Sequence, residues 1–207
     1  MGYRVVDDYY RREHFDFFRT YESPFYSINF DLDITAVKQF SRDRGTSVYL
    51  TLCYLFMRGM NRVEDFRYRV VNEEIVIHEQ LEIAATVPAP NGAFSFARFD
   101  HDPDLESFLR RADAVAQRAS EKATLAETAE GNTILFTAIP GVRFTGLTHV
   151  TPVDRTDGRA RVAFGRFYED AGRSMVPVGL GVNHIFIDGV ALGRLVEEVQ
   201  SEFNHPG

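Results

Sequence analysis

The pattern of apolar and polar positions predicts a long strand followed by a helix near the C-terminus. In the strand, residues 175–187, apolar side chains alternate with small or polar ones, as expected when one face is buried: Val176, Val178, Leu180 and Val182. In the helix, apolar side chains recur at intervals of three or four: Leu192, Leu195, Val196, Val199 and Phe203. The junction between the two elements reads His184-Ile185-Phe186-Ile187-Asp188-Gly189.

The rest of the chain alternates predicted helices and strands. Helices are expected at residues 9–19, between a capping Asp33 and a terminating Gly45, at 46–63 and at 103–120. Strands are expected at residues 67–71, 75–78, 83–87, 94–99, 134–139, 143–150 and 162–168, with a hairpin turn between the first two. This order indicates an α/β fold with a large sheet covered by helices. Because no linker divides the sequence, we expect residues 1–207 to form a single domain.

Composition favours a soluble enzyme of the cytoplasm. The 207 residues are 44% apolar and 26% charged, with no apolar run of membrane-spanning length and no secretory leader. The single cysteine, Cys53, has no partner for an internal disulfide, which fits a reducing compartment. A net charge of −7 and the lack of a basic run argue against nucleic acid as a partner, and no membrane partner is expected.

His184 is the main candidate for chemistry. A histidine at the end of a buried strand, just before a glycine turn, is held rigidly and can face a cavity. An ordinary imidazole is largely neutral near pH 7, so such a residue is suited to act as a general base. The alternative is a structural histidine, and the spacing alone does not separate the two interpretations. We expect no metal site, because the other five histidines are scattered singly without ligand spacing.

Two stretches at opposite ends of the chain resemble motifs of the chloramphenicol acetyltransferase family. The segment from Asn183 to Gly189 is similar to the family's HHxxxDG motif, and Arg11-Arg12-Glu13-His14-Phe15 is similar to its N-terminal motif. The acyltransferase cores of 2-oxoacid dehydrogenase complexes and the condensation domains of peptide synthetases share the first motif but not the second. The resemblance implies a two-layer α+β sandwich with a large mixed sheet. It also implies acetyl-coenzyme A as co-substrate, no bound cofactor, and a homotrimer with active sites between subunits.

The resemblance assigns roles to four residues. His184 matches the base that takes a proton from the acceptor hydroxyl as that hydroxyl attacks the thioester. Asp188 matches an aspartate that pairs with the arginine corresponding to Arg11, so both are expected to support the site. Thr137 matches the serine of an S-A-x-P segment, and its hydroxyl is placed to donate to the oxyanion. Without the resemblance, Arg11 is a solvated helix charge and Thr137 is an ordinary strand threonine.

Other matches concern the two substrates. Arg166 and Phe167 match a Lys-Tyr pair along the coenzyme A site, although such a pair is ordinarily surface and core. Asn183 replaces the first motif histidine, Phe18 replaces a tyrosine that contacts chloramphenicol, and Ala163 replaces a nearby threonine. The acceptor pocket is therefore expected to be more apolar. The candidates for its aromatic walls are Phe25, Tyr26, Phe94 and Phe96, although phenylalanine in a strand is more often part of the core.

The expected function is acetyl transfer from acetyl-coenzyme A to a hydroxyl group of chloramphenicol or a related small molecule, an activity associated with antibiotic resistance. One alternative keeps the chemistry but changes the acceptor to another alcohol, an amine or a carrier-bound acyl group. A further alternative is a non-catalytic trimeric homologue that retains the fold. Acyl-coenzyme A binding without chloramphenicol turnover would favour the first alternative, and a His184→Ala substitution without functional effect would favour the second.

Overall fold

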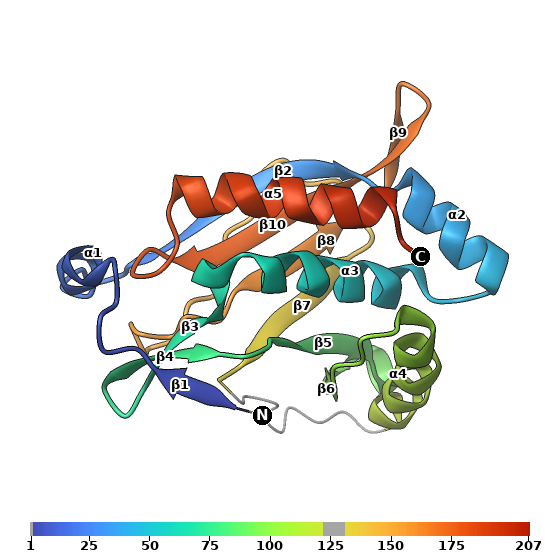
Figure 1. Ribbon diagram of the computed structural model, residues 1–207. Helices are drawn as coiled ribbons and strands as arrows, with labels where there is room; N and C mark the ends of the chain where they lie inside the picture. The colour runs from blue at the N-terminus through green and yellow to red at the C-terminus, as the bar shows by residue number, and fades with distance from the viewer. Residues whose placement is uncertain (1, 122–130) are drawn as a thin grey trace.

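The computed structural model describes residues 2–121 and 131–207, which form two β-sheets with helices packed against them (Figure 1). The strands of the large sheet follow the order β2 (Phe25–Asp33), β10 (Arg173–Asn183), β8 (Arg161–Gly165), β7 (Thr133–Ile139), β5 (Glu82–Pro88) and β6 (Phe94–Phe99), and β9 (Tyr168–Asp170) also pairs with β10. Strand β7 is parallel to β5 and β8, whereas the other pairs are antiparallel. The large sheet is therefore mixed. A smaller sheet has the order β1 (Tyr3–Val5), β4 (Glu74–His78) and β3 (Tyr68–Val71).

Long helices lie on one side of the large sheet (Figure 1). They are α2 (Thr35–Arg44), α3 (Val48–Arg62), α4 (Leu105–Ser120) and α5 (Gly189–Asn204). Helix α3 has ten buried residues and packs along α5, as its nearly continuous apolar sequence predicts. A Cβ atom on Gly59 of α3 would lie 2.9 Å from a methyl carbon of Val199 on α5, so glycine permits the close approach of the two helices.

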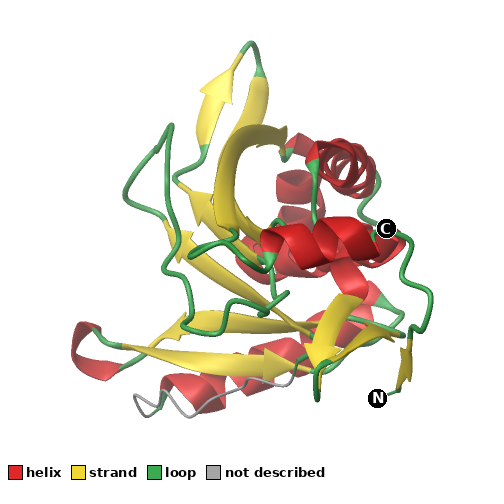
Figure 2. Cartoon of the chain, turned by 90° about the vertical axis from the view of Figure 1, so that its left-hand side faces the viewer, coloured by secondary structure: helices red, strands yellow, loops and turns green. Residues whose placement is uncertain are grey.

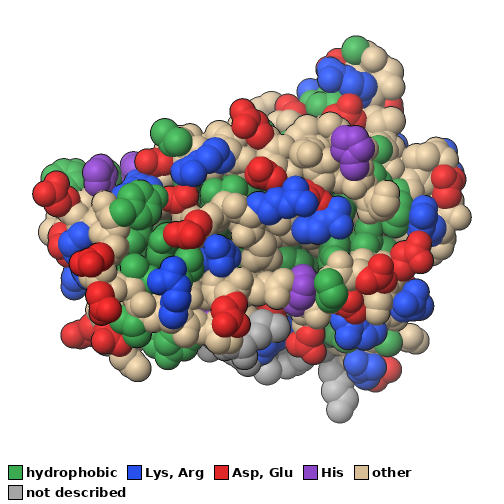
Figure 3. All heavy atoms as spheres, viewed as in Figure 1, with side chains coloured by type: hydrophobic (Ala, Val, Ile, Leu, Met, Phe, Trp, Pro, Cys, Tyr) green, Lys and Arg blue, Asp and Glu red, His purple; other side chains and the backbone are tan. Residues whose placement is uncertain are grey.

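The remaining short elements lie outside this layer. Helix α1 (Arg12–Phe18) lies beside the end of β10 in Figure 1, and two 3-10 turns are η1 (Glu64–Arg67) and η2 (Pro90–Gly92). On the helix-covered face, acidic and basic side chains are intermingled (Figure 3). The described residues contain neither a helix long and apolar enough to cross a membrane nor a metal-binding cluster of histidine, cysteine and carboxylate side chains.

Loops lie against the face of the large sheet opposite the helices (Figure 2). The described stretch 142–160 contains no strand or helix, and it places Leu147 over Gly179 and His149 over Gly181. Cβ atoms on these two glycines would lie 3.0 Å and 2.9 Å from the loop side chains, so the loop rests directly on β10. Further along, the same face carries partly exposed side chains of Thr86, Phe94, Phe96 and Thr137.

The structure corrects several details of the predicted elements. Residues 143–150 do not form a strand; instead Leu147 and His149 pack on Gly179 and Gly181 of β10. Strand β10 ends at Asn183 instead of residue 187, and the predicted strand 162–168 is interrupted after Gly165. Asp33 is the last residue of β2 and not the helix cap: its carboxylate accepts from the N–H of Thr35 at 2.9 Å, whereas Ile34 occupies the N-cap position.

Three strands have no counterpart in the prediction. Strands β1 and β9 contain three residues each, which is too short for a recognisable period. Strand β2 lies at an edge of the large sheet, and only Leu32 among its side chains is fully buried. Its sequence therefore lacks a clear alternation of buried apolar and exposed polar residues. The hairpin at residues 68–78 is confirmed. Its turn residues Asn72 and Glu73 have φ angles of 50° and 67°, the left-handed conformation that a two-residue hairpin turn requires.

Candidate active site

His184 lies directly beyond β10, at the start of the turn that leads into α5. Its backbone N–H donates to the carbonyl of Pro24 at 2.8 Å, which holds the turn against the chain entering β2. Its ring stacks on Phe18 of α1, with ring centroids 4.0 Å apart and planes 12° apart, and Tyr26 flanks it at 4.9 Å. The Nδ1 atom is buried and has no hydrogen-bond partner among the described residues. The imidazole is therefore held in place by aromatic contacts and by its backbone.

Arg11 connects the N-terminal segment to this turn. Its guanidinium donates to the carbonyl of Phe186 at 2.9 Å and lies 3.2 Å from a carboxylate oxygen of Asp188. A second carboxylate, that of Asp65, lies 3.4 Å from the same guanidinium. Arg11 is 7% exposed, so these contacts form largely out of solvent. The side chain thereby joins three segments that are distant in the sequence.

Asp188 serves as the N-cap of α5. One carboxylate oxygen accepts from the N–H groups of Val190 at 3.0 Å and Ala191 at 2.9 Å, and the other faces Arg11. Partial burial favours a higher pKa for this carboxyl group, but the bond from the Ala191 N–H and the charge of Arg11 together hold the pKa below its usual range. Within the described residues both oxygens have partners other than His184. Asp188 thus supports the turn and does not orient the imidazole.

Asp65, in η1, belongs to the same network and has no signal in the sequence. It is 3% exposed, and one of its oxygens accepts from the hydroxyl of Tyr10 at 2.5 Å. Its other oxygen accepts from Arg194 of α5 at 3.2 Å. A carboxylate shared by two arginines and a tyrosine satisfies the rule that buried charges are paired. It links the start of α1 to α5 behind the His184 turn.

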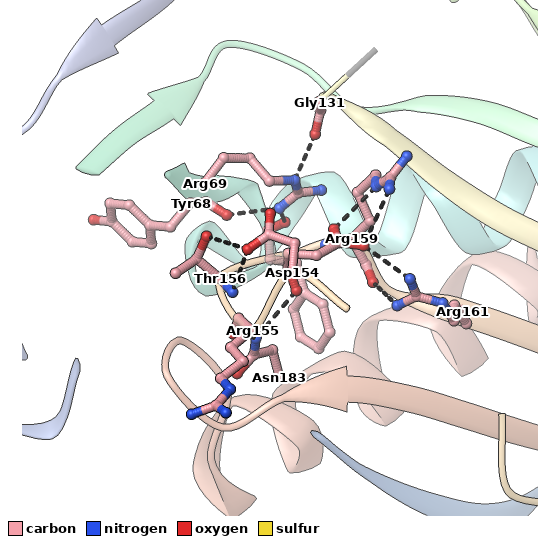
Figure 4. A network of polar contacts seen from close by, with 11 residues as sticks. Tyr68, Arg69, Gly131, Asp154, Arg155, Thr156, Arg159, Arg161 and Asn183 are labelled. Atoms are coloured by element: carbon pink, nitrogen blue, oxygen red, sulfur yellow. Dashed lines mark hydrogen bonds and ion pairs between the residues drawn. The ribbon is translucent and has the colours of Figure 1, made fainter. Parts of the chain in front are cut away.

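Asn183, where the family motif has a histidine, holds the adjacent loop in place. Its amide Nδ2 donates to the carbonyls of Arg155 at 2.8 Å and Asp157 at 3.1 Å, and its Oδ1 accepts from the N–H of Ile185 at 3.0 Å. Figure 4 shows Asn183 within a wider polar network that includes Arg155, Arg159 and Arg161. The Asp157 carboxylate binds Arg159 and Arg161. The side chain is 2% exposed. Its role in the structure is to fix the bend between β10 and the His184 turn.

Thr137 lies in a different place, at the C-terminal ends of β5, β7 and β8. An open cavity of about 590 Å³ is lined there by apolar side chains together with the hydroxyl-bearing Thr137, Thr86 and Tyr49. The Thr137 and Thr86 hydroxyl oxygens lie 3.1 Å apart. Phe94 and Phe167, from the predicted acceptor and coenzyme A sites, line the same cavity and are 48% and 37% exposed. This cavity brings three of the predicted site residues together.

The other predicted residues are spread over the sheet. Ala163 is fully buried in β8, between Thr137 and Gly179 in the register. Arg166 is exposed, and its N–H donates to the carbonyl of Val142. Phe25 lines a small cleft with His149.

His184 and Thr137 lie far apart within one chain. Thr137 is in register with Gly179 of β10 through Ala163, and His184 is five residues beyond Gly179. With about 3.3 Å per residue along a strand and about 4.8 Å between strands, the separation is roughly 19 Å. One chain therefore does not unite the predicted base with the predicted oxyanion donor.

Comparison with known proteins identifies the family. A family model described as chloramphenicol acetyltransferase matches residues 1–200. The chain belongs to the chloramphenicol acetyltransferase family. A chloramphenicol acetyltransferase from Bacillus pumilus is 24% identical to this family member over 99% of the chain and 94% of its own length.

Solved structures agree on the fold of this family member. A chloramphenicol acetyltransferase structure superposes with a TM-score of 0.90 at 23% identity, covering 97% of this chain and 99% of the other. A probable dihydrolipoamide acetyltransferase from Listeria monocytogenes superposes with a TM-score of 0.68 at 12% identity, covering 95% and 90% of the two chains. The predicted α+β architecture with a large mixed sheet is thus confirmed.

Proposed function

We propose that the protein transfers the acetyl group of acetyl-coenzyme A to a hydroxyl group of chloramphenicol or a related small molecule. Its membership of the chloramphenicol acetyltransferase family supports this reaction class. The observation that carries the proposal is His184, packed against two aromatic rings on a turn held by Arg11 and Asn183, with Nδ1 buried.

In this reaction Nε2 of His184 takes the proton of the acceptor hydroxyl while its oxygen attacks the thioester carbonyl. The hydroxyl of Thr137 donates to the oxyanion of the tetrahedral intermediate. The intermediate then collapses, the carbon–sulfur bond breaks, and the proton passes from His184 to the leaving thiolate. General base catalysis is typically worth about 10²- to 10⁴-fold, and one oxyanion donor about 10²- to 10³-fold.

The separation of about 19 Å between His184 and Thr137, worked from strand spacings, supports a site that takes its residues from two copies of the chain. A homotrimer with sites between neighbouring subunits meets this requirement, as the family resemblance implies. The base then comes from one subunit, and the cavity with Thr137 and Phe167 comes from the next. Exposed apolar side chains such as Val150 and Val153 on the loop-covered face suit burial at a subunit contact.

The substrates are assigned to the cavity of about 590 Å³. Its apolar wall suits the pantetheine arm and acetyl group of acetyl-coenzyme A. Exposed Arg166 lies next to Phe167 in the chain, where its guanidinium can bind a phosphate of coenzyme A. Phe18 and Ala163 offer no hydroxyl, so the acceptor side is less polar than the family pattern implies. The second candidate function follows from this observation: the same transfer to a more apolar alcohol.

Thiol release tests the proposal. Purified protein is mixed with acetyl-coenzyme A and chloramphenicol, and free thiol is followed with a chromogenic disulfide. The only cysteine, Cys53, is buried and adds little background. Release that is lost in His184→Ala supports the reaction and the base. Coenzyme A binding without thiol release would indicate an acceptor other than chloramphenicol. A His184→Ala protein with full activity would reject the mechanism.

Complementation tests the shared site. His184→Ala and Thr137→Val proteins are each expected to be nearly inactive. Co-unfolding and refolding the two together creates some interfaces that combine an intact His184 with an intact Thr137, so activity returns. The control is the doubly substituted protein, unfolded and refolded alone in the same way. No recovery, or a monomer mass by light scattering, would contradict a site formed between subunits.

A further inference from the structure

Two threonine side chains stand side by side on the loop-covered face of the large sheet. Strands β5 and β7 are parallel, and Ala85 is in register with Phe136, so Thr86 and Thr137 are adjacent and point to the same face. Their hydroxyl oxygens lie 3.1 Å apart, within hydrogen-bond distance. Both side chains are partly exposed and line the cavity of about 590 Å³.

The surroundings of this pair are mostly apolar, and the phenol of Tyr49 is the third hydroxyl group among the side chains that line the cavity. The apolar part of the lining includes Val87, Phe94 and Phe164. A hydroxyl group has one hydrogen to donate and two positions to accept. When two hydroxyls share one hydrogen bond, one hydrogen is used and one is left. The residue that keeps its free hydrogen is the one able to donate to a substrate.

We propose that Thr86 is a positioning residue that donates its hydrogen to Thr137 and so directs the Thr137 hydrogen toward the substrate oxyanion. The proposal rests on the proposed function, in which Thr137 is the oxyanion donor. The bond from Thr86 occupies an acceptor position of the Thr137 oxygen, which restricts rotation of its hydroxyl. It also polarises that hydroxyl, because linked hydrogen bonds strengthen one another in surroundings of low polarity. Preorganised donors of this kind are the main source of oxyanion stabilisation.

Valine has nearly the shape of threonine and favours strands, so Thr86→Val removes the hydroxyl with little change to β5. A lost neutral hydrogen bond corresponds to a rate effect of about 5- to 10-fold. We expect kcat to fall by about that factor, with KM for both substrates unchanged. Thr86→Ser keeps the hydroxyl and is expected to stay within about 2-fold of the parent kcat, a rescue that loss of packing alone would not give.

A double-mutant cycle with Thr137→Val is the decisive measurement. Thr137→Val is expected to lower kcat by about 10²- to 10³-fold. Because Thr86 acts through Thr137, adding Thr86→Val to that variant is expected to cause no further loss. If the loss of kcat in the double variant equals the product of the two single losses, or if kcat is unchanged in Thr86→Val, the role of Thr86 is overturned while the role of Thr137 stands. A fully active Thr137→Val protein would instead reject the proposed oxyanion donor.

A folding defect is separated by a second pair of variants. Thr86→Ser and Thr86→Ala both lack the methyl group of threonine and differ from each other only by the hydroxyl. If Thr86→Val unfolds, the ratio of kcat between these two variants carries the same information. The expected ratio is about 5- to 10-fold in favour of serine. A ratio near one would overturn the proposal.

Discussion

Replacing Asn183 by aspartate is a sharp test of how the His184 turn is held. The change preserves shape, and one oxygen still accepts from the N–H of Ile185. The other oxygen, however, replaces an amide nitrogen that donates to two carbonyls, at 2.8 Å and 3.1 Å. Since the site is 2% exposed, a carboxylate there is buried against two carbonyl oxygens without a donor. We expect Asn183→Asp to lower the free energy of unfolding by about 3–5 kcal/mol at pH 7.5.

The pH dependence of this loss has a definite sign. Repulsion from the two carbonyls and burial raise the pKa of the introduced carboxyl group above that of an unfolded aspartate, about 3.9. The folded state then binds more protons than the unfolded state between these two pKa values, so stability falls as pH rises. Protonation also supplies a donor to one carbonyl. The deficit relative to the parent should therefore shrink between pH 7.5 and pH 5, by about 1.4 kcal/mol for each unit of pKa elevation in that range.

Urea unfolding at several pH values measures both effects, with parent and variant at equal protein concentration. Asn204→Asp is the matched control. Asn204 is exposed, and its Oδ1 accepts from Gln200 at 2.9 Å, a contact that aspartate keeps. We expect the control to stay within about 0.5 kcal/mol of the parent at every pH. An Asn183→Asp protein as stable as the parent at pH 7.5, or one whose deficit grows on acidification, would refute the reasoning.

Three further predictions concern packing, reactivity and acid stability. Gly59→Ala places a Cβ atom 2.9 Å from Val199 and should lower the unfolding free energy in urea by about 1–3 kcal/mol, whereas Gly193→Ala, with nothing within 4 Å, should raise it by up to about 1 kcal/mol. Cys53 should resist thiol reagents until urea unfolds the protein, because burial raises the pKa of its thiol; rapid labelling of the folded chain would contradict this. The lowered pKa of Asp188 stabilises the fold above the pKa of an unfolded aspartate, so the stability difference between parent and Asp188→Asn should be complete at pH 7 and shrink progressively as the pH falls below the pKa of the unfolded aspartate and through the lower folded pKa.

Long periodic segments made much of the fold predictable from the sequence. The strand at Val176–Val182 and the helix that follows bury continuous apolar patterns, and these survive in β10 and α5. Residues 143–150 were wrongly predicted as a strand. In the structure they belong to a loop that packs Leu147 and His149 against glycines of β10. The periodicity of apolar residues shows which side of a single helix or strand is buried. It does not report which element lies opposite.

The site was predictable only where a motif marked it. His184, Asp188 and Arg11 stand in two such motifs, and the structure places Asp188 and Arg11 3.2 Å apart. Asp65 and Thr86 carry no local signal, since a carboxylate after a helix and a threonine in a strand are common. Their neighbours are supplied by chain segments 50 or more residues away. Such contacts arise from the tertiary structure and not from spacing.

The place of β10 has a consequence for how the molecule is made. This strand lies between β2 and β8, yet it is the last strand of the sheet in the chain, and Val182 pairs with Tyr26 across some 150 residues. During synthesis, β2 has no partner strand until nearly the whole chain has emerged. Closing the long loop between β2 and β10 slows folding. His184 follows β10 directly, so the step that places β10 between β2 and β8 also sets the imidazole against Phe18. An incompletely folded chain therefore exposes a long strand edge and has no catalytic turn.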